Sequence, residues 1–186
     1  MTFLLAGGAA LRQLQETEPN VEIVWRAFEL RPEPVPTLDP NGEYLHRVWG
    51  SSVYPLAEKL NVKMKLPPVQ PRSRRAHEAA QWARHQGKFA EYNEALFRSF
   101  FERGEDIGNV DVLTRLASEL GLENNAFRQA LDNREYLESV LADEREAQTL
   151  GITGVPAFVA NRKVALSGVQ SVENLKQLIE RARSSV

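Results

Sequence analysis

The chain has 186 residues, 42% of them hydrophobic and 26% charged, which is typical of one globular domain or one domain carrying an insertion. Its 23 Lys and Arg and 25 Asp and Glu give a formal charge of −2, which excludes the basic surface that nucleic-acid binding needs. The chain has no cysteine, which excludes disulfide bonds, thiolate metal sites and thiol redox chemistry by its own side chains.

The first twenty residues contain an apolar run and then a helical pattern. Residues 2–11 (TFLLAGGAAL) lack the preceding Lys or Arg of a signal peptide and are too short to span a bilayer. We therefore expect them to enter the core of a cytoplasmic protein that has no membrane partner. The pattern LRQLQETE predicts a short exposed helix over residues 11–18, which Pro19 and Asn20 end.

Residues 21–30 (VEIVWRAFEL) alternate, with Val21, Ile23, Trp25 and Ala27 on one face. This period of two predicts a strand with one strongly apolar face. Residues 31–42 (RPEPVPTLDPNG) contain four prolines and predict an extended connection that leaves the sheet.

Residues 43–150 read as helical almost throughout, and breaks at proline, glycine and asparagine predict five or six helices. Two stripes stand out. One is made of small residues and predicts close approach by a neighbouring helix, and the other is made of large residues that fit against it. The small stripe is Ala76, Ala79, Ala80 and Ala83, after a possible cap at Ser73, and the large stripe is Phe89, Tyr92, Leu96, Phe97 and Phe100.

After residue 151 the period returns to two. Residues 157–160 and 163–166 predict two short strands joined by a turn at Asn161 and Arg162, which together form a hairpin. Ser171 can cap a last amphipathic helix that carries Val172, Leu175, Leu178, Ile179 and Ala182 on one face.

Few polar residues indicate chemistry. His46, His77 and His85 lack the spacing of a metal site, and we expect them to be surface residues on helices, so no metal ligand is predicted. Arg72, Arg74 and Arg75 could meet an anion, but such a run of charges is usually a solvated face.

The most informative segment is residues 151–158 (GITGVPAF), in which a glycine-rich loop and Pro156 lead directly into a strand. About 5–6% of such peptide bonds are cis, and the sequence leaves the isomer of Val155–Pro156 open.

Together with the hairpin, three stretches resemble DsbA-like thioredoxin-fold oxidoreductases, particularly their cytoplasmic FrnE-type branch. They are residues 154–158 (GVPAF) with 167–170 (SGVQ), residues 24–30 (VWRAFEL), and residues 73–77 (SRRAH) through 101–107 (FERGEDI). The resemblance implies an α/β fold, a thioredoxin-like sheet with an inserted all-helical domain. Residues 1–40 and 151–186 would form the thioredoxin-like part, and residues 41–150 the helical insertion.

The resemblance also implies a binding site. Pro156 would be a cis-proline, and the backbone at Gly154, Val155 and Pro156 would bind an extended peptide or a thiol substrate, with glutathione as a possible cofactor. Main-chain pairing of this kind accepts a peptide of any sequence.

The Cys-x-x-Cys motif of the family is missing. Counted without a gap, it maps onto Met1, Thr2, Phe3 and Leu4, which cannot attack a disulfide, so no catalytic residue is predicted. The first strand of the family would precede Met1. Either the natural protein starts upstream, or the active site has been lost and residues 2–5 form a short replacement strand.

Three functions remain open. The chain is a DsbA-family thiol-disulfide oxidoreductase-like protein that is truncated or redox-inactive, or a glutathione-dependent transferase or isomerase similar to the kappa class. In the second case Thr2 carries the only hydroxyl near the position of the missing motif. The third is a non-catalytic peptide-binding module, and a homodimer could cover its exposed sheet.

Overall fold

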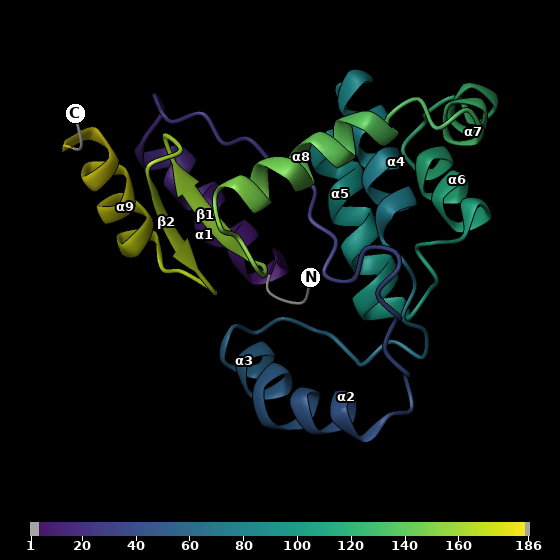
Figure 1. Cartoon of the computed structure of the whole chain (residues 1–186), viewed down its shortest axis with the longest axis horizontal. Helices are drawn as coiled ribbons and strands as arrows, with labels where there is room; N and C mark the ends of the chain where they lie inside the picture. Colours follow the sequence, from purple (N-terminus) through teal and green to yellow (C-terminus); the bar gives the residue numbers. More distant parts are fainter. Residues whose placement is uncertain (1–3, 185–186) are drawn as a thin grey trace.

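The computed structural model describes residues 4–184, and its helices and strands are arranged as in Figure 1. In chain order they are α1 (Leu4–Thr17), α2 (Glu43–Val48), η1 (Trp49–Val53), α3 (Tyr54–Lys59), α4 (Arg74–His85), α5 (Phe89–Arg98), η2 (Ser99–Arg103), α6 (Val110–Glu119), α7 (Asn124–Asp132), α8 (Leu137–Thr149), β1 (Ala157–Ala160), β2 (Val164–Ser167) and α9 (Val172–Ser184). The π-helical segments η1 and η2 continue their neighbouring helices. No helix within the described range is long and apolar enough to cross a bilayer.

A small α/β part lies at one end of the molecule (Figure 1). Strands β1 and β2 pair antiparallel, with Ala160 opposite Val164, and Asn161 and Arg162 adopt positive φ angles of 50° and 59° in the turn. Helix α9 packs against both strands and against α1. The Ser171 hydroxyl accepts a hydrogen bond from the backbone N–H of Asn174 at 3.1 Å. The predicted hairpin, cap and last helix are all confirmed.

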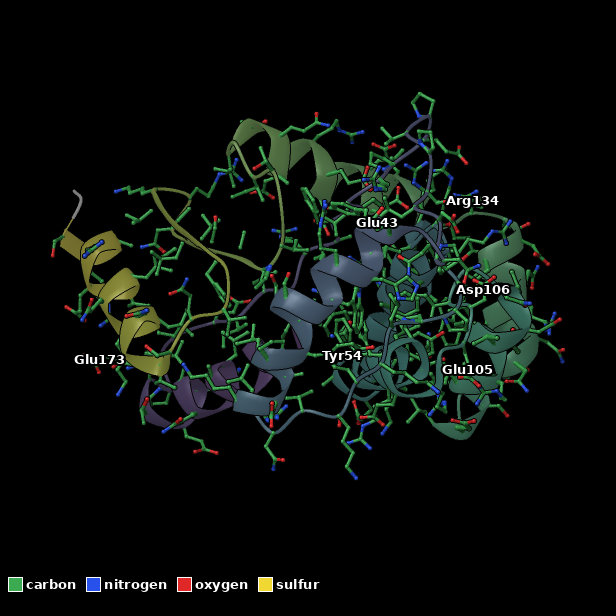
Figure 2. The ribbon with its side chains drawn as sticks, turned by 90° about the horizontal axis from the view of Figure 1, so that it is seen from below. Glu43, Tyr54, Glu105, Asp106, Arg134 and Glu173 are labelled. Atoms are coloured by element: carbon green, nitrogen blue, oxygen red, sulfur yellow. The ribbon has the colours of Figure 1, made fainter. Side chains whose placement is uncertain are left out.

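The helical block is built around α4, which packs against α5, α7 and α8. All four alanines of the small-residue stripe are buried, and so are the large residues of α5 and η2 apart from Phe89, which packs against the core from its edge. The prediction that these two helices pack together is confirmed. In Figure 2, the continuous helical segment that starts at Glu43 and passes Tyr54 crosses the lower face of the molecule.

Residues 43–150 form six continuous helical segments, in agreement with the expected five or six. The α/β class is thus confirmed, while the domain boundaries at residues 40 and 150 stay a prediction. Ser73 precedes α4, but its side chain makes no capping hydrogen bond, so that predicted cap is wrong.

The strand predicted over residues 21–30 is wrong. The segment is extended, and its burial alternates as predicted, with Ala27 and Glu29 buried and Arg26 and Leu30 exposed. It pairs with no strand, however, because β1 and β2 form a sheet of their own among the described residues. A replacement strand is also absent at Leu4, which begins α1, while residues 2 and 3 of that prediction lie outside the described range.

Candidate functional site

Side chains of α4 and α8, rather than a neighbouring strand, bind the extended segment of residues 21–30. The buried carboxylate of Asp143, on α8, accepts a hydrogen bond from the backbone N–H of Ala27 at 2.9 Å. The same carboxylate accepts from the guanidinium of Arg26 at 2.9 Å and from the amide of Gln81 at 3.4 Å. A charged acceptor with several donors is among the stronger interactions in a protein interior. Asp143 therefore ties the extended segment to both α8 and α4.

Helix α4 presents a polar face to the same segment, because Arg74, Gln81 and Arg84 follow the spacing of one helix face. The Arg84 guanidinium donates to the carbonyl of Trp25 at 2.9 Å, and that of Arg74 donates to the Glu29 carboxylate at 2.8 Å. The alanine stripe was the only packing face predicted for this helix. The polar residues Arg74, Gln81 and Arg84, at the spacing of one helix face, were the signal that could have revealed its second face.

Two carboxyl groups, those of Glu29 and Glu144, meet around Arg74. Burial raises the pKa of Glu29, and the Arg74 charge opposes that rise. Burial also raises the pKa of Glu144, and the negative charge of Glu29 adds to the effect. In each carboxyl group Oε1 is buried without a hydrogen-bond partner, since Arg74 lies 2.8 Å from Oε2 of Glu29 and 4.0 Å from Oε2 of Glu144. One cation therefore serves a buried acid, Glu29, and a partly buried one, Glu144.

The prediction for His77 is wrong, whereas His46 and His85 are exposed as expected. The His77 imidazole enters the interior, where its Nε2 is buried without a partner. Burial lowers the pKa of His77 to about 4, and a hydrogen bond to the backbone of Phe28 opposes that shift. His77 is therefore neutral at physiological pH. Within residues 4–184, no three His, Asp or Glu side chains gather as a metal site would need.

The predicted solvated face at the arginine cluster is also wrong in part. Arg74 is largely buried with Glu29, and Arg72 donates to the carbonyl of Arg31 at 3.0 Å and lies 3.4 Å from Glu33. Arg72 thus connects the start of α4 to the proline-rich connection, and Arg74 connects it to the extended segment.

The loop of Gly154, Val155 and Pro156 leads into β1. The Val155–Pro156 peptide bond is cis, and the buried Pro156 accepts a hydrogen bond through its carbonyl from the backbone N–H of Gly168 at 2.9 Å. The backbone N–H and carbonyl of Val155 have no hydrogen-bond partner among the described residues. A side chain added at Gly154 would meet nothing within 4 Å. The loop thus offers one backbone donor and one backbone acceptor that no described residue uses.

The family motif positions Met1, Thr2 and Phe3 lie outside the described residues, and Leu4 begins α1. No cysteine lies near the loop, because the chain has none.

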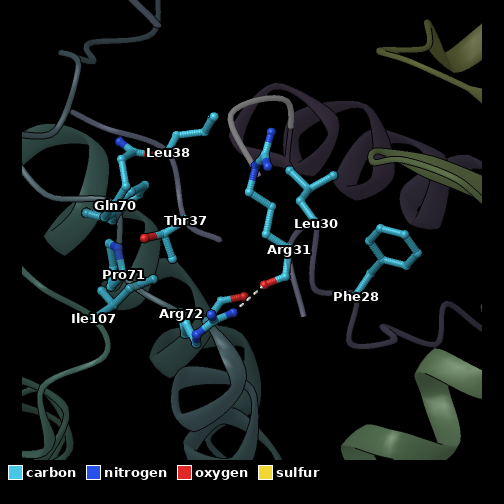
Figure 3. Close-up of a pocket in the computed structure, with 11 residues that line it drawn as sticks. Phe28, Leu30, Arg31, Thr37, Leu38, Gln70, Pro71, Arg72 and Ile107 are labelled. Carbon is cyan, nitrogen blue, oxygen red and sulfur yellow. Dashed lines mark hydrogen bonds between the residues drawn. The ribbon is translucent and has the colours of Figure 1, made fainter. Parts of the chain in front are cut away.

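A pocket opens beside the end of the extended segment (Figure 3). Apolar side chains form most of its walls, and two arginines lie at its edge. Its lining residues are Phe28, Leu30, Arg31, Thr37, Leu38, Gln70, Pro71, Arg72, Ser73, Phe100 and Ile107. None belongs to the Val155 loop. No local pattern in the sequence predicted this pocket, because its walls come from five separate stretches of the chain.

Comparison with known proteins agrees with this architecture. The model of the DSBA-like thioredoxin domain matches residues 5–180. The Bacillus subtilis (strain 168) protein "Uncharacterized protein YwbO" is 37% identical over 161 residues, which cover 84% of this chain and 80% of that protein.

Two solved structures share the fold. A probable DsbA oxidoreductase from Streptomyces coelicolor superposes with a TM-score of 0.78 at 24% identity, over 100% of this chain and 87% of that one. A 2-hydroxychromene-2-carboxylate isomerase superposes with a TM-score of 0.77 at 16% identity, over 97% of this chain and 90% of that one.

The chain belongs to the DSBA-like thioredoxin domain family. The predicted family and its thioredoxin fold are confirmed, and the FrnE-type branch stays a prediction.

Proposed function

We propose that this DsbA-like protein binds an extended peptidic ligand at Gly154, Val155 and Pro156, and that its own residues carry out no dithiol-disulfide exchange. The ligand is glutathione or an unfolded peptide, whose main chain pairs with that of Val155. The absence of cysteine supports the second half of the proposal, since no side chain of the chain can form a mixed disulfide.

The unused backbone groups of Val155 carry the first half. Backbone N–H and C=O groups in folded proteins are almost always hydrogen-bonded, to protein or to water. At Val155 both groups lack a protein partner among the described residues, directly before a strand. A ligand with an extended backbone can satisfy both groups at once, as in strand addition, and needs no particular side chain at position 155.

The test is a calorimetric titration of the protein with reduced glutathione and with a cysteine-free unstructured peptide. The variant Gly154→Val adds a side chain beside the unused groups, where it meets no protein atom within 4 Å and should leave the fold intact. Losing two backbone hydrogen bonds of about 1 kcal/mol each should weaken binding by roughly tenfold or more.

Gly50→Val is the matched control, because Gly50 also faces open space but lies in η1. It should bind as the wild type does. Equal binding by wild type and Gly154→Val, or no binding of either ligand to the wild type, would overturn the proposal.

The two ligands also separate the remaining alternatives. Binding of glutathione without the peptide favours a glutathione-dependent transferase or isomerase of kappa-class type. Binding of the peptide alone favours a non-catalytic module. Under either outcome the chain should reduce insulin no faster than a buffer blank containing the same reductant, because it lacks thiols.

A further inference from the structure

The pocket beside the end of the extended segment is separate from the loop at Val155, and the proposed function makes no use of it. Figure 3 shows Thr37, Gln70 and Pro71 on one side and Leu30 on the other, with Arg31 between them. The buried side chains of Phe100 and Ile107 also line it, so its walls are mainly apolar.

Positive charge lies at the pocket. Arg31 has no acidic partner within the described part of the chain, and its guanidinium makes one long hydrogen bond, 3.3 Å, to the carbonyl of Pro36. Arg72 shares its charge with Glu33, whose side chain is 66% exposed. The nearby charge of Arg74 is taken by Glu29. The guanidinium of Arg31 therefore remains available to an anion, and water screens it only in part beside apolar walls.

Uncharged polar groups of the pocket are also unused. The hydroxyls of Thr37 and Ser73 and the amide of Gln70 make no hydrogen bond with the described residues. They can donate to a carboxylate that Arg31 holds, so the pocket combines an apolar wall with several donors. Small-molecule sites typically have this composition, an apolar lining with a few polar groups that fix orientation.

The volume of the pocket limits the size of the apolar group that a ligand can place in it. The cavity measures about 130 Å³. An apolar cavity of about 150 Å³ takes up a benzene molecule, so this pocket holds one six-membered ring or a short branched chain. The cavity is too small to enclose a long-chain fatty acid or a nucleotide.

We propose that this pocket binds a small monocarboxylate whose single apolar group is about the size of a six-membered ring. The apolar group lies against Leu30, Phe100 and Ile107, and the carboxylate pairs with the guanidinium of Arg31. A carboxylate and a guanidinium form two parallel charge-assisted hydrogen bonds, which make the site selective for a planar anion.

The experiment uses two probes of nearly equal shape, cyclohexanecarboxylate and uncharged cyclohexanemethanol, in an NMR titration of the ¹⁵N-labelled chain. Cyclohexanecarboxylate should shift the amide signals of the lining residues, and cyclohexanemethanol should bind at least tenfold more weakly, since it lacks the charge. This comparison needs no variant and so does not depend on any variant folding.

The variant Arg31→Gln then tests the assigned cation. It should weaken the binding of cyclohexanecarboxylate by roughly tenfold and leave the binding of cyclohexanemethanol unchanged. Arg98→Gln is the control of equal charge change, because Arg98 pairs with Glu94 on the exposed side of α5. It should leave both probes unaffected.

Three results would overturn the proposal: no shift at the lining residues up to 20-fold excess over about 1 mM protein, equal affinity for the two probes, or unchanged carboxylate binding by Arg31→Gln. Inorganic phosphate serves as a further probe. If it displaces the carboxylate and binds as tightly, the site takes anions of any kind and the apolar part of the proposal is wrong. Every one of these results is independent of ligand binding at Val155.

Discussion

The backbone N–H of Ala27 donates a hydrogen bond to Oδ2 of Asp143 at 2.9 Å, across 116 positions of sequence. Ala27 is 5% exposed and Asp143 is 4% exposed, so water cannot replace either partner. An extended segment that joins no sheet must satisfy its buried backbone groups in some other way. Here the Asp143 carboxylate on α8 accepts from the Ala27 N–H, and the Arg84 guanidinium on α4 donates to the carbonyl of Trp25.

Replacing Asp143 with alanine should therefore destabilise the protein strongly. The change leaves the Ala27 N–H buried and unpaired and removes the nearer of the two acidic partners of Arg26, which together cost about 3 kcal/mol. Urea unfolding at pH 7 measures the loss. Asp111→Ala is the control, because Asp111 pairs with Arg128 at the surface, and such a pair contributes less than about 1 kcal/mol. Equal losses in the two variants would contradict the role assigned to Asp143.

The stability should fall as the pH drops from about 6.5 to 4, because of His77. Its pKa is lowered from 6.5 to about 4 in the folded protein. Between these values the unfolded chain binds a proton that the folded chain does not, so acid favours unfolding. The full difference of about 2.5 pKa units corresponds to roughly 3 kcal/mol.

His77→Gln isolates this effect, since Glu29 and Glu144 act in the opposite direction. Their raised pKa values mean that the folded state holds protons more tightly, and their contribution is lost as the pH rises above about 4.5. Urea midpoints at pH 7 and pH 4.5 should differ less in His77→Gln than in the wild type. The exposed His46→Gln should behave as the wild type. An ordinary imidazole titration of His77 near pH 6.5 by NMR would contradict the prediction.

Two glycines with the same backbone conformation should tolerate alanine differently. Gly104 has φ = 72° and Gly87 has φ = 70°, so alanine at either position adopts a left-handed conformation that costs about 1 kcal/mol. A Cβ at Gly104 would also lie 2.9 Å from Cδ of Pro68, whereas one at Gly87 meets nothing within 4 Å. Gly104→Ala should thus cost about 1–3 kcal/mol more than Gly87→Ala in thermal or urea unfolding. Equal costs would show that the loop at Pro68 moves aside freely.

The contact between α4 and α5 predicts that two alanines should differ in how well they tolerate replacement by leucine. Ala79 is 0% exposed on the small-residue stripe, and leucine there forces the helices apart at a cost of about 1–3 kcal/mol. Ala90 is exposed on α5, and Ala90→Leu should change the free energy of unfolding by about 0.5 kcal/mol or less. Unfolding of both variants by urea, with unchanged slopes, makes the comparison. A tolerated leucine at position 79 would mean that the helices are not closely packed.

Local patterns in the sequence were sufficient to predict much of the fold. The spacing of Ala76, Ala79, Ala80 and Ala83 predicted a helix face and its burial, because an α-helix repeats every 3.6 residues whatever surrounds it. The alternation in the hairpin and the cap at Ser171 were predicted for the same reason. The loop at Val155 and Pro156 was singled out through a resemblance, and both its role in binding and its ligand stay predictions.

Neither the polar face of α4 nor the pocket could be predicted from the sequence. His77 and Arg74 look like surface residues in the sequence, since nothing local indicates that the extended segment covers them. Likewise, Arg31 and Ile107 line one pocket only because distant parts of the chain meet there. Such neighbours depend on contacts between residues far apart in sequence, which no local period encodes.

The sequence by itself determined that this chain carries no cysteine, that residues 43–150 are mostly helical, and that residues 21–30 are extended with alternate sides buried. Each follows from composition or from a repeat within a few residues. Only the tertiary structure decided what the extended segment pairs with. An extended backbone presents the same donors and acceptors to a neighbouring strand or to a side chain, and the position of Asp143 on α8 selected the side chain.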